Sequence, residues 1–271
     1  MQADTENNKG LVKFTNELAR SIGEARSILV CVGAGISVNA GIPDFRSPDS
    51  GVYSRIGDAE EIFHIENYQD DPIPFYKLCS AMFSFDISAL EPTRTHMFIK
   101  RLADSGKLLR CYTQNIDGLE LKAGLRVNQD VIQCHGNLEK IVCSECRTTS
   151  RLLPNDWRRD VSAFVGLDID DPNRIPPSLK CSKCGGFLKP SVVMFGEPLP
   201  PDFFSQIQSD TQCCDLVLII GTSLTVFPFA AIPRLVHPDI PQYVISRGVA
   251  RGETSIDGDC DLILNLVSSK L

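Results

Sequence analysis

The sequence predicts an α/β fold, a parallel sheet with helices on both faces and a small insert domain beside it. Two runs of strand length, Ser27–Val32 and Leu216–Ile220, are almost entirely apolar, as in strands buried on both faces. Segments with helical spacing of apolar residues alternate with such runs, which is typical of parallel sheets. Polar loops also begin directly where the predicted strands end.

Periodicity places the elements along the chain. Leu11, Phe14, Leu18 and Ile22 have helical spacing, so residues 11–26 should form an amphipathic helix before the first strand. The remaining expected helices are 75–85, 93–105 and 201–213, and the remaining expected strands are 108–112, 131–134, 216–220, 243–245 and 262–264.

Two stretches depart from this alternation. Proline and acidic residues interrupt residues 51–91, and residues 138–190 contain two pairs of cysteines. We therefore expect a Rossmann-like domain from residues 1–50, 92–137 and 191–271. The helical insert 51–91 and the zinc-binding insert 138–190 would form the small domain.

Composition limits the partners. The chain has 271 residues, 43% of them hydrophobic, and a net charge of −7, which disfavours direct nucleic acid binding and permits basic, lysine-bearing substrates. No apolar run approaches the ~18 residues of a membrane span, so no membrane association is expected. The polar first ten residues show no secretory or organelle signal. Eleven cysteines then indicate a reducing compartment, cytoplasmic and/or nuclear.

A glycine-rich loop follows the first strand. Gly33-Ala34-Gly35-Ile36-Ser37 removes side chains where a backbone must approach closely, and a following helix N-terminus favours phosphate. A full dinucleotide fingerprint would have Gly or Ala at the position of Val38. The motif alone therefore leaves a phosphate-binding loop and a simple tight turn equally open.

A second part of this loop presents three chemically different side chains in succession. Asp44, Phe45 and Arg46 follow Pro43 in a stretch without helical or strand periodicity. A loop with an acid, an aromatic ring and a base in sequence favours contact with a ligand over packing in a core.

Four polar loops follow predicted strands. Gly33, Asn115, His135 and Gly221 each come just after a strand. Ligands of open α/β sheets bind at the carboxyl ends of the strands, so these loops should converge on one crevice.

The cysteine pairs predict a metal site. Cys143-x-x-Cys146 and Cys181-x-x-Cys184 can supply four thiolates to a structural Zn²⁺ that has no open position for substrate. Free or redox-active thiols are the alternative. Most of the other cysteines lie in or beside apolar strands and are expected to be buried.

His135 is one of four histidines, and its position after a strand and close to Asn115 and Asp117 favours a general base over a structural role.

Together these motifs resemble the sirtuins, in their eukaryotic deacetylase branch. The resemblance covers about residues 10 to 265. It rests on seven motifs that occur along the chain in the order seen in the family. They are residues 33–37, Gly41-Ile-Pro-Asp-Phe-Arg-Ser47, Thr113-Gln-Asn-Ile-Asp117, His135-Gly136, the Cys pairs, Val193-Met-Phe-Gly-Glu197 and Gly221-Thr-Ser223.

The resemblance implies NAD-dependent removal of acyl groups, mainly acetyl, from protein lysines. The products would be nicotinamide, O-acyl-ADP-ribose and free lysine, with NAD as co-substrate and Zn²⁺ as a structural ion. His135 would deprotonate a ribose hydroxyl, and Asn115 would position the nicotinamide ribose. Ile116 and Asp117 would hold the nicotinamide carboxamide, with Asp117 accepting a hydrogen bond from its N–H. Acyl-lysine proteins or peptides would be the partners.

The resemblance also assigns the binding residues. The cofactor-binding set would be Gly33, Ala34, Gly35, Ile36, Ser37, Asp44, Phe45, Arg46, Gln114, Asn115, Ile116, Asp117, Gly221, Thr222, Ser223, Ser246, Arg247 and Cys260. The residues Val193, Phe195, Gly196 and Glu197 would bind the substrate, pairing with its backbone as an added strand.

Some positions depart from the family pattern. Ser246-Arg247 stands where the family usually has Asn, which puts an adenine-ribose contact in question. Members that remove succinyl or malonyl groups carry Tyr-x-x-Arg. Here Tyr53 is followed three positions later by Ile56, and Arg55 is one residue early. Because a carboxylate in an apolar channel needs a cation, the sequence predicts neutral acyl groups, acetyl first.

Two other functions share part of this pattern. An NAD-using oxidoreductase would have the first strand and loop, but it should have the complete glycine fingerprint and leaves the cysteine pairs and His135 without a joint role. A non-catalytic, zinc-bearing adaptor that senses NAD is the second alternative, and the presence of Asn115, Asp117 and His135 disfavours it.

Overall fold

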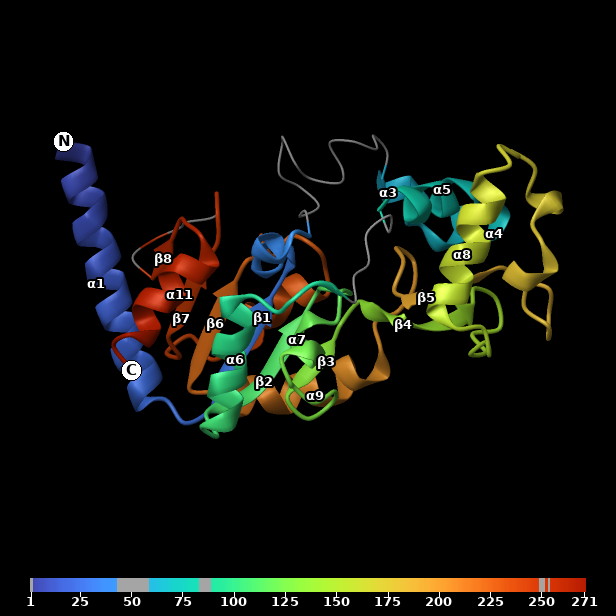
Figure 1. Cartoon of the computed structure of the whole chain (residues 1–271). Helices are drawn as coiled ribbons and strands as arrows, with labels where there is room; N and C mark the ends of the chain where they lie inside the picture. The colour runs from blue at the N-terminus through green and yellow to red at the C-terminus, as the bar shows by residue number, and fades with distance from the viewer. Residues whose placement is uncertain (1, 43–58, 83–88, 249–251, 253) are drawn as a thin grey trace.

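The computed structural model describes residues 2–42, 59–82, 89–248, 252 and 254–271. Within these ranges, six strands form one parallel sheet in the order β3-β2-β1-β6-β7-β8, as Figure 1 shows. The strands are β1 (Ile28–Val32), β2 (Leu108–Thr113), β3 (Val131–Gln133), β6 (Leu216–Ile220), β7 (Gln242–Ile245) and β8 (Ser255–Ile256). The predicted parallel, Rossmann-like sheet is confirmed.

The strand order reverses between β1 and β6. From β1 the chain adds strands outward on one side, and from β6 it adds them on the other. This is the topological switch point of a doubly wound sheet, and ligands of such sheets bind in the crevice that opens there.

Helices cover both faces of the sheet because the side chains of each strand alternate. Ile28, Val30 and Val32 pack in one core with α1 (Gln2–Glu24), α6 (Arg94–Asp104) and α11 (Cys260–Ser268). Leu29 and Cys31 point to the other core, which includes residues of α9 (Pro201–Cys213) and α10 (Ile232–Leu235). All five residues of β1 are fully buried, which explains its uninterrupted apolar sequence.

One predicted strand is wrong. Residues 262–264 belong to helix α11, and the last strand of the sheet is β8. Asp259 caps the helix by accepting a hydrogen bond from the backbone of Leu262. The apolar run conceals a helical pattern: Cys260, Ile263, Leu264 and Val267 are buried, while Leu262 is 65% exposed.

The N-terminal helix is longer than predicted, beginning at Gln2 and ending at Glu24. No helix in the described part of the chain is both long and apolar enough to cross a membrane.

The segments from the two expected inserts pack together at one end of the molecule (Figure 1). They comprise α3 (Ala59–Ile62), α4 (Ile65–Asp70), α5 (Ile73–Met82), α8 (Pro154–Val165) and the antiparallel pair β4 (Gly136–Cys143) and β5 (Leu188–Val192). Their core surrounds the buried Trp157, whose indole N–H donates to the carbonyl of Leu188 at 2.8 Å. The boundaries of the two-domain division stay a prediction.

Gly136 connects the main sheet to this second unit. It has φ +74°, a left-handed conformation, and pairs with Val192 of β5. A Cβ atom at this position would lie 1.9 Å from the carbonyl oxygen of Ser191. Only glycine fits, and the residue directly follows His135.

Replacement of Gly136 by Ala should therefore strongly destabilise the protein. We expect a loss of at least ~1–3 kcal/mol in the free energy of unfolding from the backbone conformation alone, with the clash added. Urea denaturation measures it. Gly106→Ala is the matched control, because Gly106 has φ +70° but no atom lies within 4 Å of the position that its Cβ would take. Equal losses in the two variants would contradict the proposed close contact.

Candidate active site and metal centre

The carboxyl ends of the strands open into a cavity of about 510 Å³ at the switch point. The loops after β1, β2, β3 and β6 all contribute to its lining, through Gly35, Asn115, His135 and Thr222 among others. The convergence predicted for the four polar loops is present in the structure, and the volume suits a small-molecule site.

The glycines of the first loop bring two backbones together. The Gly35 N–H donates to the carbonyl of Gly221 at 2.9 Å. A Cβ atom on Gly35 would lie 2.7 Å from the Cα of Gly221, and one on Gly33 would lie 2.8 Å from the Cβ of Thr222. The glycine-rich sequence is therefore required by contact between the loops after β1 and β6. Two 3₁₀ turns follow, Ala34–Ile36 and Val38–Ala40.

The cavity lining contains most of the residues that the sequence assigned to a cofactor or substrate. They are Ala34, Gly35, Gln114, Asn115, Ile116, His135, Val193, Phe195, Gly196, Glu197, Gly221, Thr222, Ser223, Ser246, Arg247 and Cys260. Their individual roles stay predictions. Asp44, Phe45 and Arg46, and the Tyr53, Arg55 and Ile56 positions used for acyl preference, lie outside the described residues.

Four assigned residues, Gly33, Ile36, Ser37 and Asp117, lie behind the lining. Gly33 contacts Thr222, and Ile36 is buried in the hydrophobic core. Ser37 is fully buried and donates from its hydroxyl to Asp117 at 2.8 Å. The structure thus places these four where they support the residues that face the cavity.

Asn115 links the supporting network to the cavity. Its side-chain amide donates to the carbonyl of Gly33 and to the hydroxyl of Ser37, each at 3.2 Å. Its backbone N–H donates to the hydroxyl of Thr113 at 3.0 Å. With these donors engaged, Asn115 is held in one orientation at the cavity wall.

Sequence reasoning did not assign several lining residues. Thr225, Val226, Phe227 and Pro228 continue the loop after β6, and their place just beyond Gly221-Thr-Ser223 was the available signal. Phe63 also lines the cavity, but it comes from the helical insert, and no local pattern indicated its position.

His135 is set up to act as a base. Its Nδ1 lies 3.1 Å from the carbonyl oxygen of Gln114, which can only accept, so Nδ1 carries the proton and Nε2 keeps its lone pair. Burial lowers the pKa of His135 below its ordinary value of 6.5, and the hydrogen bond to Gln114 opposes this in part. The neutral imidazole is therefore the dominant form at pH 7.

The lining also offers donors for phosphate. Ala34 and Thr222 line the cavity, and their backbone N–H groups make no hydrogen bond within the described residues. Arg247 is the one lysine or arginine among the described lining residues, and it pairs with Asp259 at 2.7 Å. These groups fit a negatively charged dinucleotide such as NAD.

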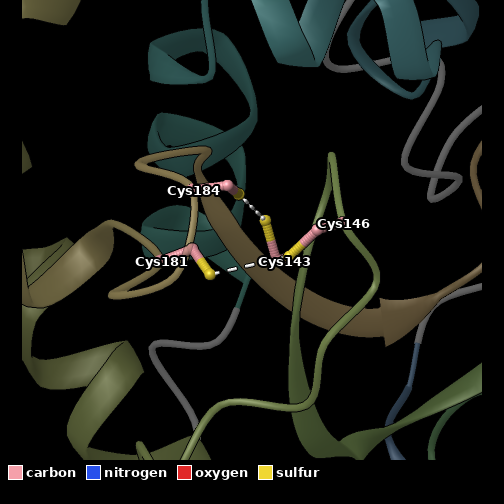
Figure 2. A group of neighbouring side chains, drawn as sticks. All are labelled: Cys143, Cys146, Cys181 and Cys184. Atoms are coloured by element: carbon pink, nitrogen blue, oxygen red, sulfur yellow. Dashed lines mark hydrogen bonds between the residues drawn. The ribbon is translucent and has the colours of Figure 1, made fainter.

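Four cysteines from two loops meet in the second unit. Figure 2 shows Cys143, Cys146, Cys181 and Cys184 directed toward one another. Their sulfur atoms all lie within 4.8 Å of one another, with Cys143 to Cys184 at 3.4 Å and Cys146 to Cys181 at 3.8 Å. A tetrahedral zinc with Zn–S near ~2.3 Å requires sulfur separations of about 3.8 Å. The cluster fits the predicted structural Zn²⁺.

Loss of this metal should unfold the unit that it holds. We expect Cys143→Ala to lose bound zinc and to unfold or aggregate, because a structural zinc contributes folding free energy. Metal analysis and circular dichroism provide the measurement. Cys213→Ala, at an exposed cysteine outside the cluster, should keep both metal and fold. A metal-free, cooperatively folded Cys143→Ala protein would contradict the assignment.

The predicted substrate loop is held from behind by a buried ion pair. Lys189 of β5 donates to Glu197 at 2.8 Å and to the carbonyl of Val192 at 2.6 Å, and the Lys189 side chain is only 2% exposed. Glu197 also accepts from the N–H of Met194 at 2.9 Å. The Glu197 carboxylate is thus engaged with its own loop.

Many backbone groups of the same loop are already hydrogen-bonded within the protein. Val193 donates to the carbonyl of His135, and Phe195 exchanges hydrogen bonds with Phe63 and Ile65. In the described residues, Gly196 is the member of the predicted pairing segment 193–197 whose N–H and C=O make no hydrogen bond. If the predicted pairing with a peptide occurs here, Gly196 and the carbonyls of Val193 and Glu197 are the groups with no hydrogen bond in the described residues.

Breaking the buried pair should destabilise the protein. Lys189→Met leaves the Glu197 carboxylate buried without its partner, and we expect a loss of ~3–5 kcal/mol in the free energy of unfolding. The double variant Lys189→Met/Glu197→Gln should recover much of that loss. Lys77→Met, which removes the exposed pair with Asp170, is the control and should change little. If the double variant is less stable than Lys189→Met, the pairing argument fails.

Comparison with known proteins places this site in a family. The family model of the Sir2 family matches residues 33–228. NAD-dependent protein deacetylase SIR2rp1 of Leishmania major is 40% identical over 85% of this chain and 59% of its own length. NAD-dependent protein deacetylase hst2 of Schizosaccharomyces pombe is 38% identical over 88% of this chain and 70% of its length. NAD-dependent protein deacetylase sirtuin-2 of Danio rerio is 39% identical, covering 83% of this chain and 56% of its length.

Two solved Sir2 structures share the fold of this chain. One of them, solved to explain the mechanism and regulation of Sir2 enzymes, superimposes on this chain with a TM-score of 0.77. The two are 28% identical, and the match covers 95% of this chain and 97% of the other. A Sir2 structure with a deacetylated p53 peptide and 3′-O-acetyl ADP ribose has a TM-score of 0.77 at 25% identity, over 94% and 97%. The chain spans only about 60% of the length of several relatives. With the matching family model and the shared fold, this chain belongs to the Sir2 family.

Proposed function

We propose that this protein is an NAD-dependent protein-lysine deacetylase. The observation that carries the proposal is His135, a neutral imidazole whose Nδ1 is tied to Gln114, in one cavity with Asn115 and the glycine loops. The relatives named above as NAD-dependent protein deacetylases support the same activity. Acetylated lysines in proteins or peptides would be the substrates, with neutral acyl groups preferred.

NAD would be held at the switch point. Ala34 and Thr222 would donate backbone hydrogen bonds to its phosphates, and Arg247 would lie at the rim of the same cavity. Asn115, fixed by Gly33 and Ser37, would orient the nicotinamide ribose. NAD supplies the acceptor ribose for the acyl group.

His135 would take the proton from a ribose hydroxyl. Its free Nε2 is the basic atom, and the hydrogen bond from Nδ1 to Gln114 fixes the tautomer. The loop at residues 193–197 would hold the acyl-lysine beside it, since Val193 donates to the carbonyl of His135 itself. One backbone hydrogen bond therefore links the base directly to the predicted substrate loop.

The decisive experiment measures nicotinamide release from NAD with and without an acetylated peptide. Release that requires the acetylated peptide and accompanies lysine deacetylation supports the proposal. Formation of reduced nicotinamide would indicate an oxidoreductase, and NAD binding without release would indicate an NAD-sensing adaptor. A cytoplasmic or nuclear location stays a prediction.

His135→Ala should lower the rate of deacetylation by ~10²–10⁴-fold with NAD binding nearly unchanged, because a general base acts in the chemical step. His237→Ala, at an exposed histidine outside the cavity, is the control. Steady-state kinetics and NAD titration measure the two effects. Near-normal turnover of His135→Ala would remove the residue from this role.

The pH dependence follows from the lowered pKa of His135. The base form is lost as pH falls through the folded-state pKa, which burial holds below 6.5. The acid limb of kcat/KM, which reports the free enzyme, should therefore have its midpoint below pH 6.5. A midpoint above 6.5 would show that the imidazole is not the group that titrates.

A further inference from the structure

Three titratable side chains meet behind the predicted nicotinamide site. His96 comes from α6, Asp117 from the loop after β2, and Glu120 from α7 (Leu119–Lys122). One nitrogen or oxygen atom of each lies within 4.8 Å of those of the other two. His96 and Glu120 are completely buried, so this cluster lies inside the protein and outside the cavity lining.

Two atoms of the cluster have no hydrogen-bond partner among the described residues. They are Nε2 of His96 and Oε2 of Glu120. Buried polar atoms are normally satisfied, so two unpaired atoms within one small cluster call for a common explanation.

The donor set does not suit a metal ion. His96 Nδ1 accepts a hydrogen bond from the backbone N–H of Thr93 at 3.2 Å, as part of the cap of α6. A backbone N–H can only donate, so neutral His96 carries its proton on Nε2. A cation would need the lone pair of that same atom. The cluster therefore holds an Nε2–H donor that has no partner among the described residues, on a side chain next to two carboxyl groups.

Within the described residues, His96, Asp261 and two cysteine thiols are the titratable groups that act on the two carboxyls or on one another. His96 is neutral, because burial lowers its pKa to about 4, with Asp261 of α11 opposing this. The thiols of Cys111 and Cys134 lie near Glu120 and are uncharged, since burial raises the pKa of both. No ion pair of the described residues includes Glu120. No ion pair of the described residues includes Asp117 either, so no salt bridge in that part of the chain compensates two carboxylates.

The two carboxyl groups have unequal surroundings. Asp117 accepts from the hydroxyl of Ser37 at 2.8 Å and from the N–H of Leu119 at 2.9 Å, one donor for each oxygen. Glu120 accepts from the hydroxyl of Thr113 at 2.5 Å through one oxygen and leaves the other unpaired. Burial, and then the nearby Asp117, raise the pKa of Glu120 to about 8. Two close carboxyls with such different partners ionise one after the other.

We infer that Asp117 and Glu120 form one coupled acid pair that holds a single proton at neutral pH, with the proton on Glu120 and Asp117 ionised. Glu120 is then a positioning residue: it acts through Asp117, the residue expected to accept a hydrogen bond from the nicotinamide carboxamide. That last role rests on the proposed function. The protonation state itself does not.

The first test is the pH dependence of stability in Glu120→Gln. Folded Glu120 keeps its proton up to about pH 8, whereas the unfolded chain loses it near 4.5, so the folded state is progressively penalised between these values. Glutamine has the shape of the protonated acid without this penalty. The variant should melt at a higher temperature than the wild type, by a margin that grows from pH 4.5 to pH 8. The exposed Glu24→Gln is the control and should show no such trend.

A flat or decreasing margin would overturn the inference, because it would mean that Glu120 is ionised in the folded protein. This measurement needs no catalysis, so it can fail while the deacetylase proposal stands, and the reverse also holds.

The second test is infrared spectroscopy at pH 7, which detects the C=O stretch of a protonated carboxyl group. The wild type should show this band, Asp117→Asn should keep it, and Glu120→Gln should lose it. A band that disappears in Asp117→Asn and persists in Glu120→Gln would place the proton on Asp117 and overturn the inference. The Asp117→Asn arm decides the question even where Glu120→Gln does not fold.

Discussion

The contact between the loops after β1 and β6 is the constraint on which the site depends. Gly35 and Gly221 approach so closely that neither could carry a side chain without moving the other loop. Gly221 adds a left-handed backbone at φ +63°. Because this contact lies at the switch point, it sets the position of the cavity that the loops after β2 and β3 then complete.

The second unit contributes to the site through a few connections. The hydrogen bond from Val193 to His135 fixes the predicted substrate loop beside the imidazole, and the buried Lys189 fixes it from the other side. Lys189 lies on β5, which pairs with β4, and β4 ends at Cys143 of the four-cysteine cluster. A structural ion there can thus support the substrate loop without touching the reaction.

Behind the cavity lies a cluster of buried, hydrogen-bonded polar residues. Asn115, Ser37 and Asp117 form one hydrogen-bonded chain, and the unpaired atoms of His96 and Glu120 lie next to its end. Such networks are costly to bury and are retained where orientation or charge must be fixed. Most hydrogen-bond donors and acceptors of this network are paired within the protein. The side chains of the cavity wall are therefore oriented before any ligand binds.

The sequence by itself determined the parallel sheet, the four-cysteine set and the loops that converge on the cavity, because strand periodicity, Cys-x-x-Cys spacing and the position of polar residues after strands are local signals. It did not determine that 262–264 is helical, since a three-residue apolar run suits a strand or a helix equally. Nor could it show that Ser37 and Asp117 lie behind the cavity, that Glu197 is engaged by Lys189, or that His96 meets Glu120. Those facts depend on side chains from separate elements, whose distances only the packed tertiary structure sets.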